Sequence, residues 1–201
     1  MRSAPPGADR RRAAFTLLEL LAVLGLIAIL AGIVIGSGRR AIEAGQVARA
    51  RSELAALAGA LEAYRQAYGS YPSVAPDATV GAAESGRQLY AALTGGRGPA
   101  LGAAAFARPQ RTFVATARFS LAVREANDAA NHFLDPWGNP YHYAFLGTAA
   151  GWRNPGFILF SAGPDGMATM PVPHDGILDA TFDDSRQNGQ PVNADNLYAQ
   201  R

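Results

Sequence analysis

An apolar run near the N-terminus constrains the fold of this chain more than any other feature. From Leu20 to Gly38 there are nineteen residues without a charge, rich in Leu, Ile, Val and Ala. An α-helix needs about 20 apolar residues to cross a bilayer, so this run predicts one membrane-spanning helix. A single acid, Glu19, stands directly before it. A carboxylate in a membrane helix is costly unless a positive group meets it, so the partner of Glu19 becomes the central question.

The flanking charges predict an orientation. Four arginines precede the run and two follow it, which places the N-terminus in the cytoplasm by the positive-inside rule. Residues 1–14 are predicted to be a disordered cytoplasmic leader. A removed secretory signal peptide is a weaker alternative, because its apolar core has only roughly 7–15 residues. A plain signal anchor of an unrelated membrane protein is a further alternative.

The residues around the acid resemble a known signal. Basic residues, a small residue and then Phe-Thr-Leu-Leu-Glu-Leu-Leu are similar to the class III signal of type IV pilins and type II secretion pseudopilins. The resemblance implies that a prepilin peptidase cuts between Ala14 and Phe15, and that Phe15 becomes the N-methylated first residue. It also implies that Glu19 meets the N-terminal amine of a neighbouring subunit during filament assembly. The family usually has Gly before the cut, where this chain has Ala14.

Beyond Arg40 the pattern becomes that of an amphipathic helix. One face carries apolar residues at steps of three and four: Val47, Ala50, Leu54, Leu57, Leu61, Tyr64 and Tyr68. The charged residues mostly fall elsewhere and predict a solvated face: Arg49, Arg51, Glu53, Glu62 and Arg65. We therefore predict one long helix over 16–68, loosened or kinked by the glycines at 36–45. Its part 15–38 would lie in the membrane or filament core, and its part 39–68 on the head.

Residues 69–201 are predicted to form a periplasmic globular head. Gly69 followed by Pro72 ends the long helix. We expect loops at 73–86 and 95–111 and a short helical turn at 88–93. Residues 111–123 fit either a strand or an irregular segment. Two strands, 141–146 and 156–161, predict an antiparallel hairpin. The expected fold class is α+β, a long N-terminal helix packed on a small antiparallel sheet, as in pilins.

A compact turn precedes the hairpin. Asp135-Pro-Trp-Gly-Asn-Pro-Tyr contains two prolines, a glycine and two Asx residues, and Asp135 is predicted to brace it. This turn, the following strand and Ser161-Ala-Gly-Pro-Asp-Gly closely resemble the G-type major pseudopilin of type II secretion. We assign Trp137 and Trp152 to the core of the head, and His142 to a structural role in its strand.

Composition and charge exclude several classes of protein. The chain has no cysteine, which excludes disulfides, thiolate metal sites and cysteine nucleophiles. The net charge is +2, but removing residues 1–14 leaves fourteen arginines against fifteen acids, so no nucleic-acid surface is expected. The three histidines have no metal-binding spacing, and Ser161 has no recognisable base. We expect no catalytic constellation and no enzyme activity.

The acidic tail is the candidate metal site. From Phe160 onward six aspartates face two arginines, spread among glycines. Calcium takes six to eight oxygen ligands in such flexible loops. G-type relatives bind calcium here, so the resemblance implies a structural calcium ion. Its implied ligands are Asp165, Asn193 and Asp195, with Asp175 and Asp179 as alternatives. The other interpretation is that these acids only keep a surface loop soluble.

The sequence therefore indicates a structural subunit of a type II secretion pseudopilus that helps to export proteins. The implied partners are copies of itself, minor pseudopilins, the prepilin peptidase and the inner-membrane assembly platform. The implied location is the inner membrane, single-pass with the head in the periplasm, and then a periplasmic filament. A type IV pilus subunit for adhesion, motility or DNA uptake is the main alternative. A membrane-anchored enzyme or binding module is a weaker one.

Overall fold

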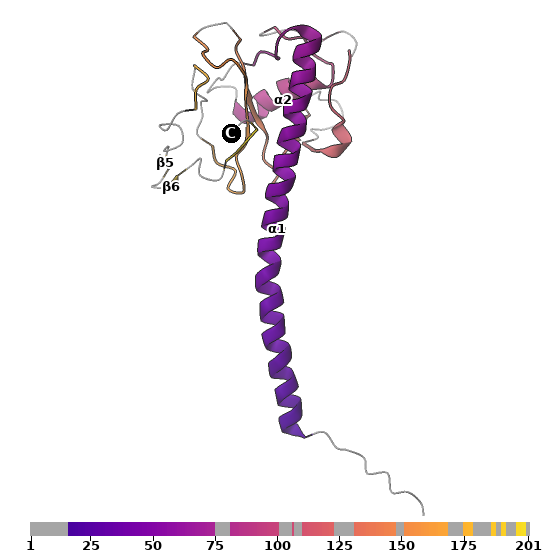
Figure 1. The fold of residues 1–201 in the computed structure, drawn as a ribbon, viewed down its shortest axis with the longest axis vertical. Coiled ribbons are helices and arrows are strands. Elements are labelled where there is room, and N and C mark those ends of the chain that lie inside the picture. Colours follow the sequence, from indigo (N-terminus) through magenta and orange to yellow (C-terminus); the bar gives the residue numbers. More distant parts are fainter. Residues whose placement is uncertain are drawn as a thin grey trace, which may run out of the picture. The chain divides into compact units, whose positions relative to one another are not determined.

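The computed structural model describes residues 16–74, 81–100, 106, 110–122, 131–147, 151–168, 175–178, 186–187, 190–191 and 196–199. Its contacts divide the chain into two compact units, Met1–Ala44 and Gly45–Arg201. The first unit contains the beginning of the long helix α1. The second contains the remainder of α1 and the head (Figure 1).

Helix α1 spans Leu17–Tyr68, which confirms the predicted helix to within one residue. It begins after Thr16 and ends at Gly69, whose N–H donates to the carbonyl of Arg65 at 2.7 Å. Gly69 has a φ of 78°, a left-handed conformation that glycine adopts without a steric penalty. The helix is continuous through residues 36–45, so the glycines there do not end it.

In the second unit, α1 buries the apolar face that its sequence predicts. Ala50, Leu54, Leu57, Leu61 and Tyr64 are all at most 1% exposed. Placing Glu53 on the solvated face was wrong, because this residue is only 6% exposed. Its two carboxylate oxygens accept hydrogen bonds from Arg49 Nε and the Tyr141 hydroxyl, both at 2.7 Å. A carboxylate can be buried when such partners replace its hydration.

Helix α2 spans Gly81–Leu93 and packs against two strands, β2 (His132–Leu134) and β3 (His142–Ala144). The predicted loop at 73–86 was therefore wrong from residue 81 onward, and the helical turn predicted at 88–93 is the end of a longer helix. A Cβ on Gly86 would lie 3.3 Å from His132 Cβ, so glycine allows the helix to approach β2 closely. Packing thus compensates for the low helix propensity of this residue.

Three small antiparallel sheets are formed within the described residues. After a short 3-10 helix, η1 (Thr116–Arg118), strand β1 (Ser120–Ala122) pairs with β2 (His132–Leu134). The central sheet has the order β3-β4-β7. Its strands are β3 (His142–Ala144), β4 (Ile158–Ser161) and β7 (Leu197–Tyr198). The third sheet pairs β5 (Arg186–Gln187) with β6 (Gln190–Pro191).

The predicted hairpin is confirmed, with His142 opposite Phe160 and Ala144 opposite Ile158. The segment that sequence reasoning left open, 111–123, contains both η1 and β1. Trp152 belongs to the core as predicted, whereas the same prediction for Trp137 was wrong: it is half-buried and lies outside the core cluster. The fold is α+β, with an N-terminal helix packed on small antiparallel sheets.

Candidate functional site

The N-terminal motif lies in the first unit. Ala14 and Phe15, the predicted cleavage pair, are outside the described residues. Thr16 caps α1, because its Oγ1 accepts a hydrogen bond from the backbone N–H of Glu19 at 3.2 Å. Glu19 itself is exposed and lies in the first helical turn, where the helix dipole stabilises a carboxylate. Sequence reasoning missed this local role, which the Thr-x-x-Glu spacing of a capping box indicates.

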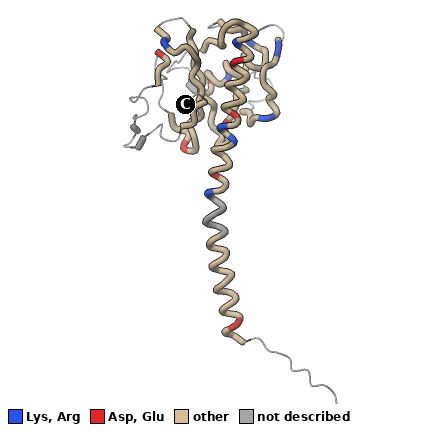
Figure 2. Tube along the Cα trace, in the orientation of Figure 1, with Lys and Arg blue, Asp and Glu red and all other residues tan. Residues whose placement is uncertain are grey.

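The helix surface that follows Glu19 is apolar and exposed. From Leu20 to Ile33 the helix has no charged residue (Figure 2), and every side chain is exposed. The leucines and isoleucines from Leu17 to Ile33 are 54–82% exposed. Soluble monomers rarely leave so large an apolar surface in water, which indicates that lipid or protein covers it. Among the described residues, no helix is long and apolar enough to cross a membrane. The predicted spanning segment 15–38 stays a prediction.

Two of the five predicted calcium ligands fall in the described residues. Asp165 is exposed in a turn, where its Oδ1 accepts a hydrogen bond from the N–H of Met167 at 2.8 Å. Asp175 Oδ1 accepts from the N–H of Ile177 at 3.1 Å, and its Oδ2 lies 3.8 Å from Arg153 Nη1. A guanidinium competes with a cation for the Asp175 carboxylate.

The remaining predicted ligands, Asp179, Asn193 and Asp195, lie outside the described residues. In the parts of the chain that are described, no group of three acidic or histidine side chains could hold a metal ion. Asp165 has the exposed carboxylate that calcium prefers, but a single carboxylate is not a ligand set. The calcium site stays a prediction.

The turn at 135–139 is braced as predicted. Asp135 is 1% exposed, and its Oδ1 accepts hydrogen bonds from the N–H groups of Trp137 at 3.0 Å and Asn139 at 2.8 Å. Its Oδ2 accepts from the Ser161 hydroxyl at 2.6 Å. Burial raises the pKa of the Asp135 carboxyl, and these hydrogen bonds oppose the shift. Asn139 Nδ2 donates to the carbonyl of Gly163 at 3.0 Å, so the turn also holds the loop that carries Asp165.

His142 and Ser161 both have structural roles in the head. The His142 ring stacks on Phe160 with 4.6 Å between centroids, and burial lowers the pKa of His142 to about 4. His142 is therefore neutral at physiological pH. Ser161 is fully buried and donates its hydroxyl to Asp135, so it is not accessible to a substrate. His174 lies outside the described residues.

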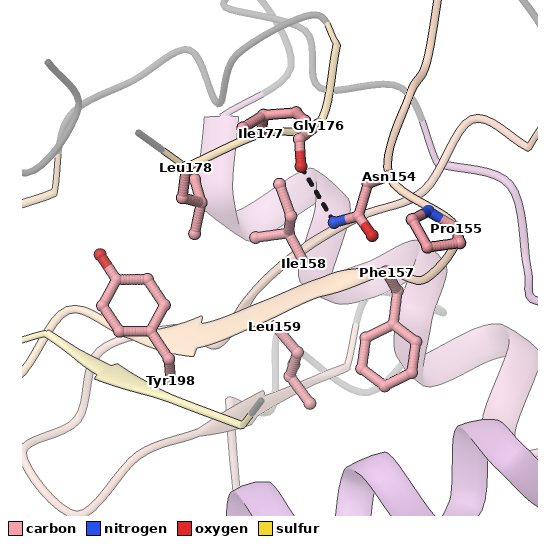
Figure 3. Close-up of a pocket in the computed structure, with 9 residues that line it drawn as sticks. All are labelled: Asn154, Pro155, Phe157, Ile158, Leu159, Gly176, Ile177, Leu178 and Tyr198. Atoms are coloured by element: carbon pink, nitrogen blue, oxygen red, sulfur yellow. Dashed lines mark hydrogen bonds between the residues drawn. The ribbon is translucent and has the colours of Figure 1, made fainter. Parts of the chain in front are cut away.

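An apolar cavity of about 230 Å³ lies beside β4. Ile158, Leu178 and Tyr198 gather on one side of the strand, whereas Phe157 and Leu159 lie on the other (Figure 3). No charged side chain among the described residues lines this cavity. Among the described lining residues, the side chains are mostly apolar, with Asn154 and Tyr198 as the polar ones.

Comparison with known proteins identifies the N-terminal motif. Residues 9–35 match the family model of the prokaryotic N-terminal methylation motif. The matched range contains the predicted cleavage pair, Glu19 and most of the apolar run. The match supports a type IV pilin-like protein and suggests processing by a prepilin peptidase and anchoring in a membrane. Neither the curated proteins nor the solved structures contain a match to this chain.

Proposed function

We propose that this chain is a structural subunit of a type II secretion pseudopilus. After cleavage between Ala14 and Phe15 and methylation of Phe15, subunits leave the inner membrane and stack their N-terminal helices into a short periplasmic filament. This filament pushes exported proteins outward. The observation that carries the proposal is the exposed apolar surface of α1 within a methylation motif. Such a surface requires lipid or neighbouring subunits to cover it.

Glu19 fixes the register between subunits in this mechanism. The N-terminal ammonium of a neighbouring copy pairs with its carboxylate, and in a low dielectric each charge offsets the burial penalty of the other. The other partners are minor pseudopilins, the prepilin peptidase and the inner-membrane assembly platform. The chain is a substrate of the peptidase rather than an enzyme.

A type IV pilus subunit is the alternative, since the same N-terminal motif serves both assemblies. Two features favour the pseudopilus. The braced turn at 135–139 belongs to the block that resembles G-type pseudopilins, and the chain lacks the cysteine pair that major pilins often carry. Measuring both protein export and surface piliation in a deletion strain of the native host separates the two. The pseudopilus proposal requires the loss of export.

The assembly role of Glu19 is tested by exchanging Glu19→Gln, with Glu43→Gln as the matched control. Both acids are exposed residues of α1. The Glu19 variant should still be processed but should fail to form filaments, because the neighbouring amine loses its counter-charge. The Glu43 variant should assemble normally. Multimers crosslinked in the periplasm of intact cells and quantified by immunoblot give the readout. Normal assembly of the Glu19 variant would refute the pairing.

A structural calcium ion is a separate part of the proposal. Asp165 would hold it together with Asn193 and Asp195, and the ion would neutralise carboxylates that otherwise repel one another. At 100 times its Kd, calcium would add about 2.7 kcal/mol of stability. The melting temperature should then rise by roughly 5–10 °C over that in chelator. Asp165→Asn should abolish this rise and Asp175→Asn should retain it. If calcium does not change the melting temperature, the calcium ion is no longer part of the proposal.

A further inference from the structure

The head has a cavity lined by basic side chains between α1 and the end of η1. It encloses about 170 Å³, and we call it the basic notch. Its lining residues are Arg49, Ser52, Glu53, Ala56, Arg118 and Phe119. The four α1 residues are spaced by three, one and three positions, so they share one helix face. The notch therefore combines a helix face with a separate segment that brings a second arginine.

The acid in the notch is already neutralised. Glu53 accepts hydrogen bonds from Arg49 Nε and from the Tyr141 hydroxyl, both at 2.7 Å. Arg49 Nη2 also donates to Ser120 Oγ at 3.1 Å. Arg118 is exposed, and within the described part of the chain its guanidinium makes no hydrogen bond or ion pair. The notch thus keeps one unbalanced positive charge and a fork of N–H donors, which suits a carboxylate.

The walls of the notch are held in place. Arg49 is fixed by its hydrogen bonds to Glu53 and to Ser120. Ser120 lies 71 residues further along the chain, so this bond ties α1 to a distant segment. Phe119, next to Arg118, is 9% exposed, and its ring centroid lies 5.0 Å from that of Phe133. A site that is organised before binding loses less conformational entropy when its ligand arrives.

The charge of the head is distributed unevenly along the chain. Residues 45–122 contain eight arginines and four acids, whereas residues 123–201 contain four arginines and nine acids. Two copies can therefore present opposite charges to each other. A contact between different surfaces of identical subunits generates an open helical assembly, which is what a filament requires. Complementary charge fixes the register and selects the partner of such a contact.

We infer that the basic notch binds a carboxylate from the acidic carboxyl-terminal part of a second copy of this chain. The inference rests on the proposed filament function and adds a contact between heads to the pairing of the N-terminal helices. Such a contact is partly exposed to solvent, so its contribution is modest and decreases with added salt.

The first test reverses the charge in the notch of the full-length chain by Arg118→Glu. Arg111→Glu is the matched control, because Arg111 is equally an exposed arginine of 45–122 but does not line the notch. We expect the yield of filament multimers crosslinked in intact cells to fall roughly three- to tenfold for the Arg118 variant and to change less than about twofold for the control. Equal filament yields from the Arg118 variant and wild type would overturn the inference.

The second test locates the partner by crosslinking. Because the chain has no cysteine, Ser52→Cys in the notch, which keeps both arginines, can be combined with one cysteine beside an aspartate, at Met167, Ile177, Ser185 or Ala194. A short bis-maleimide should join two copies in assembled filaments for at least one pair. If none of the pairs joins copies in intact filaments, a small anion or another surface occupies the notch and the inference is wrong. If wild-type chain forms no filament at all, the proposed function fails instead.

Discussion

The buried carboxylate of Asp135 gives the sharpest prediction about the head. Asp135→Ala would leave three donors without their acceptor: the N–H groups of Trp137 and Asn139 and the hydroxyl of Ser161. Each buried donor without a partner costs about 1–3 kcal/mol, and partial access of water to the turn places the sum at about 3–4 kcal/mol. That is a large fraction of the 5–15 kcal/mol that typically stabilises a folded protein.

Urea unfolding of the full chain in mild detergent measures this loss, with tryptophan fluorescence as the probe. Ser161→Ala removes one of these three bonds and also the bond that Ser161 Oγ accepts from the N–H of Gly163 at 3.1 Å, so it should cost about 2 kcal/mol. The double variant should cost less than the sum of the two single variants, because both act on the same hydrogen bond. Asp165→Ala, at an exposed aspartate, is the control in calcium-free buffer. The reasoning is refuted if Asp135→Ala costs no more than this control.

Three further perturbations test the packing of the head in the same unfolding assay. Between pH 8 and pH 5, wild type should lose about 2 kcal/mol of stability through His142, and His142→Phe should lack this loss. The folded-state pKa of His142, about 4, lies below its ordinary value, so the unfolded state binds the proton more readily and stability falls as pH falls. A pH dependence equal to that of wild type would contradict this. Arg97→Met should cost about 3 kcal/mol, since this buried guanidinium donates to three acceptors; a loss below about 1 kcal/mol would contradict it. Gly166→Ala should cost about 1–3 kcal/mol, because φ is +66° and the new Cβ would meet Asn139 Oδ1 at 2.7 Å. Gly59→Ala, in open helix, should instead stabilise by about 0.5–1 kcal/mol, and equal effects of both glycine changes would refute the strain argument.

Sequence reasoning succeeded where the structure depends on neighbouring residues. The long helix follows from apolar spacing along α1, and its end follows from Gly69. The turn at 135–139 follows from its Asx, Pro and Gly content, and the hairpin follows from two short runs around a loop. Each of these features is encoded within a few residues, which is why one sequence was enough to predict it.

The features that were missed depend on contacts between distant residues. Gly81 and Gly86 lower the helix propensity of this segment, and packing on β2 and β3 compensates for them in α2. Glu53 looks like a surface acid until Tyr141, 88 residues away, donates its hydroxyl. Trp137 looks like a core residue by type, but it belongs to a turn outside the core cluster.

The candidate sites also differ in whether their residues lie close together in the sequence. The methylation motif is local: the sequence pattern places it around Ala14, Phe15 and Glu19, and the family model matches residues 9–35. The basic notch has no sequence signature, because α1 and the end of η1 form it together. Two of its charged residues, Arg49 and Glu53, were assigned to the solvated face of the long helix for that reason.

The mature N-terminus of the protein from its native host tests the central claim most directly. Mass spectrometry should find a peptide that begins at Phe15 and carries one added methyl group. This result would establish the processing on which filament assembly depends. An intact start at Met1, or a cut beyond Gly38, would contradict the account.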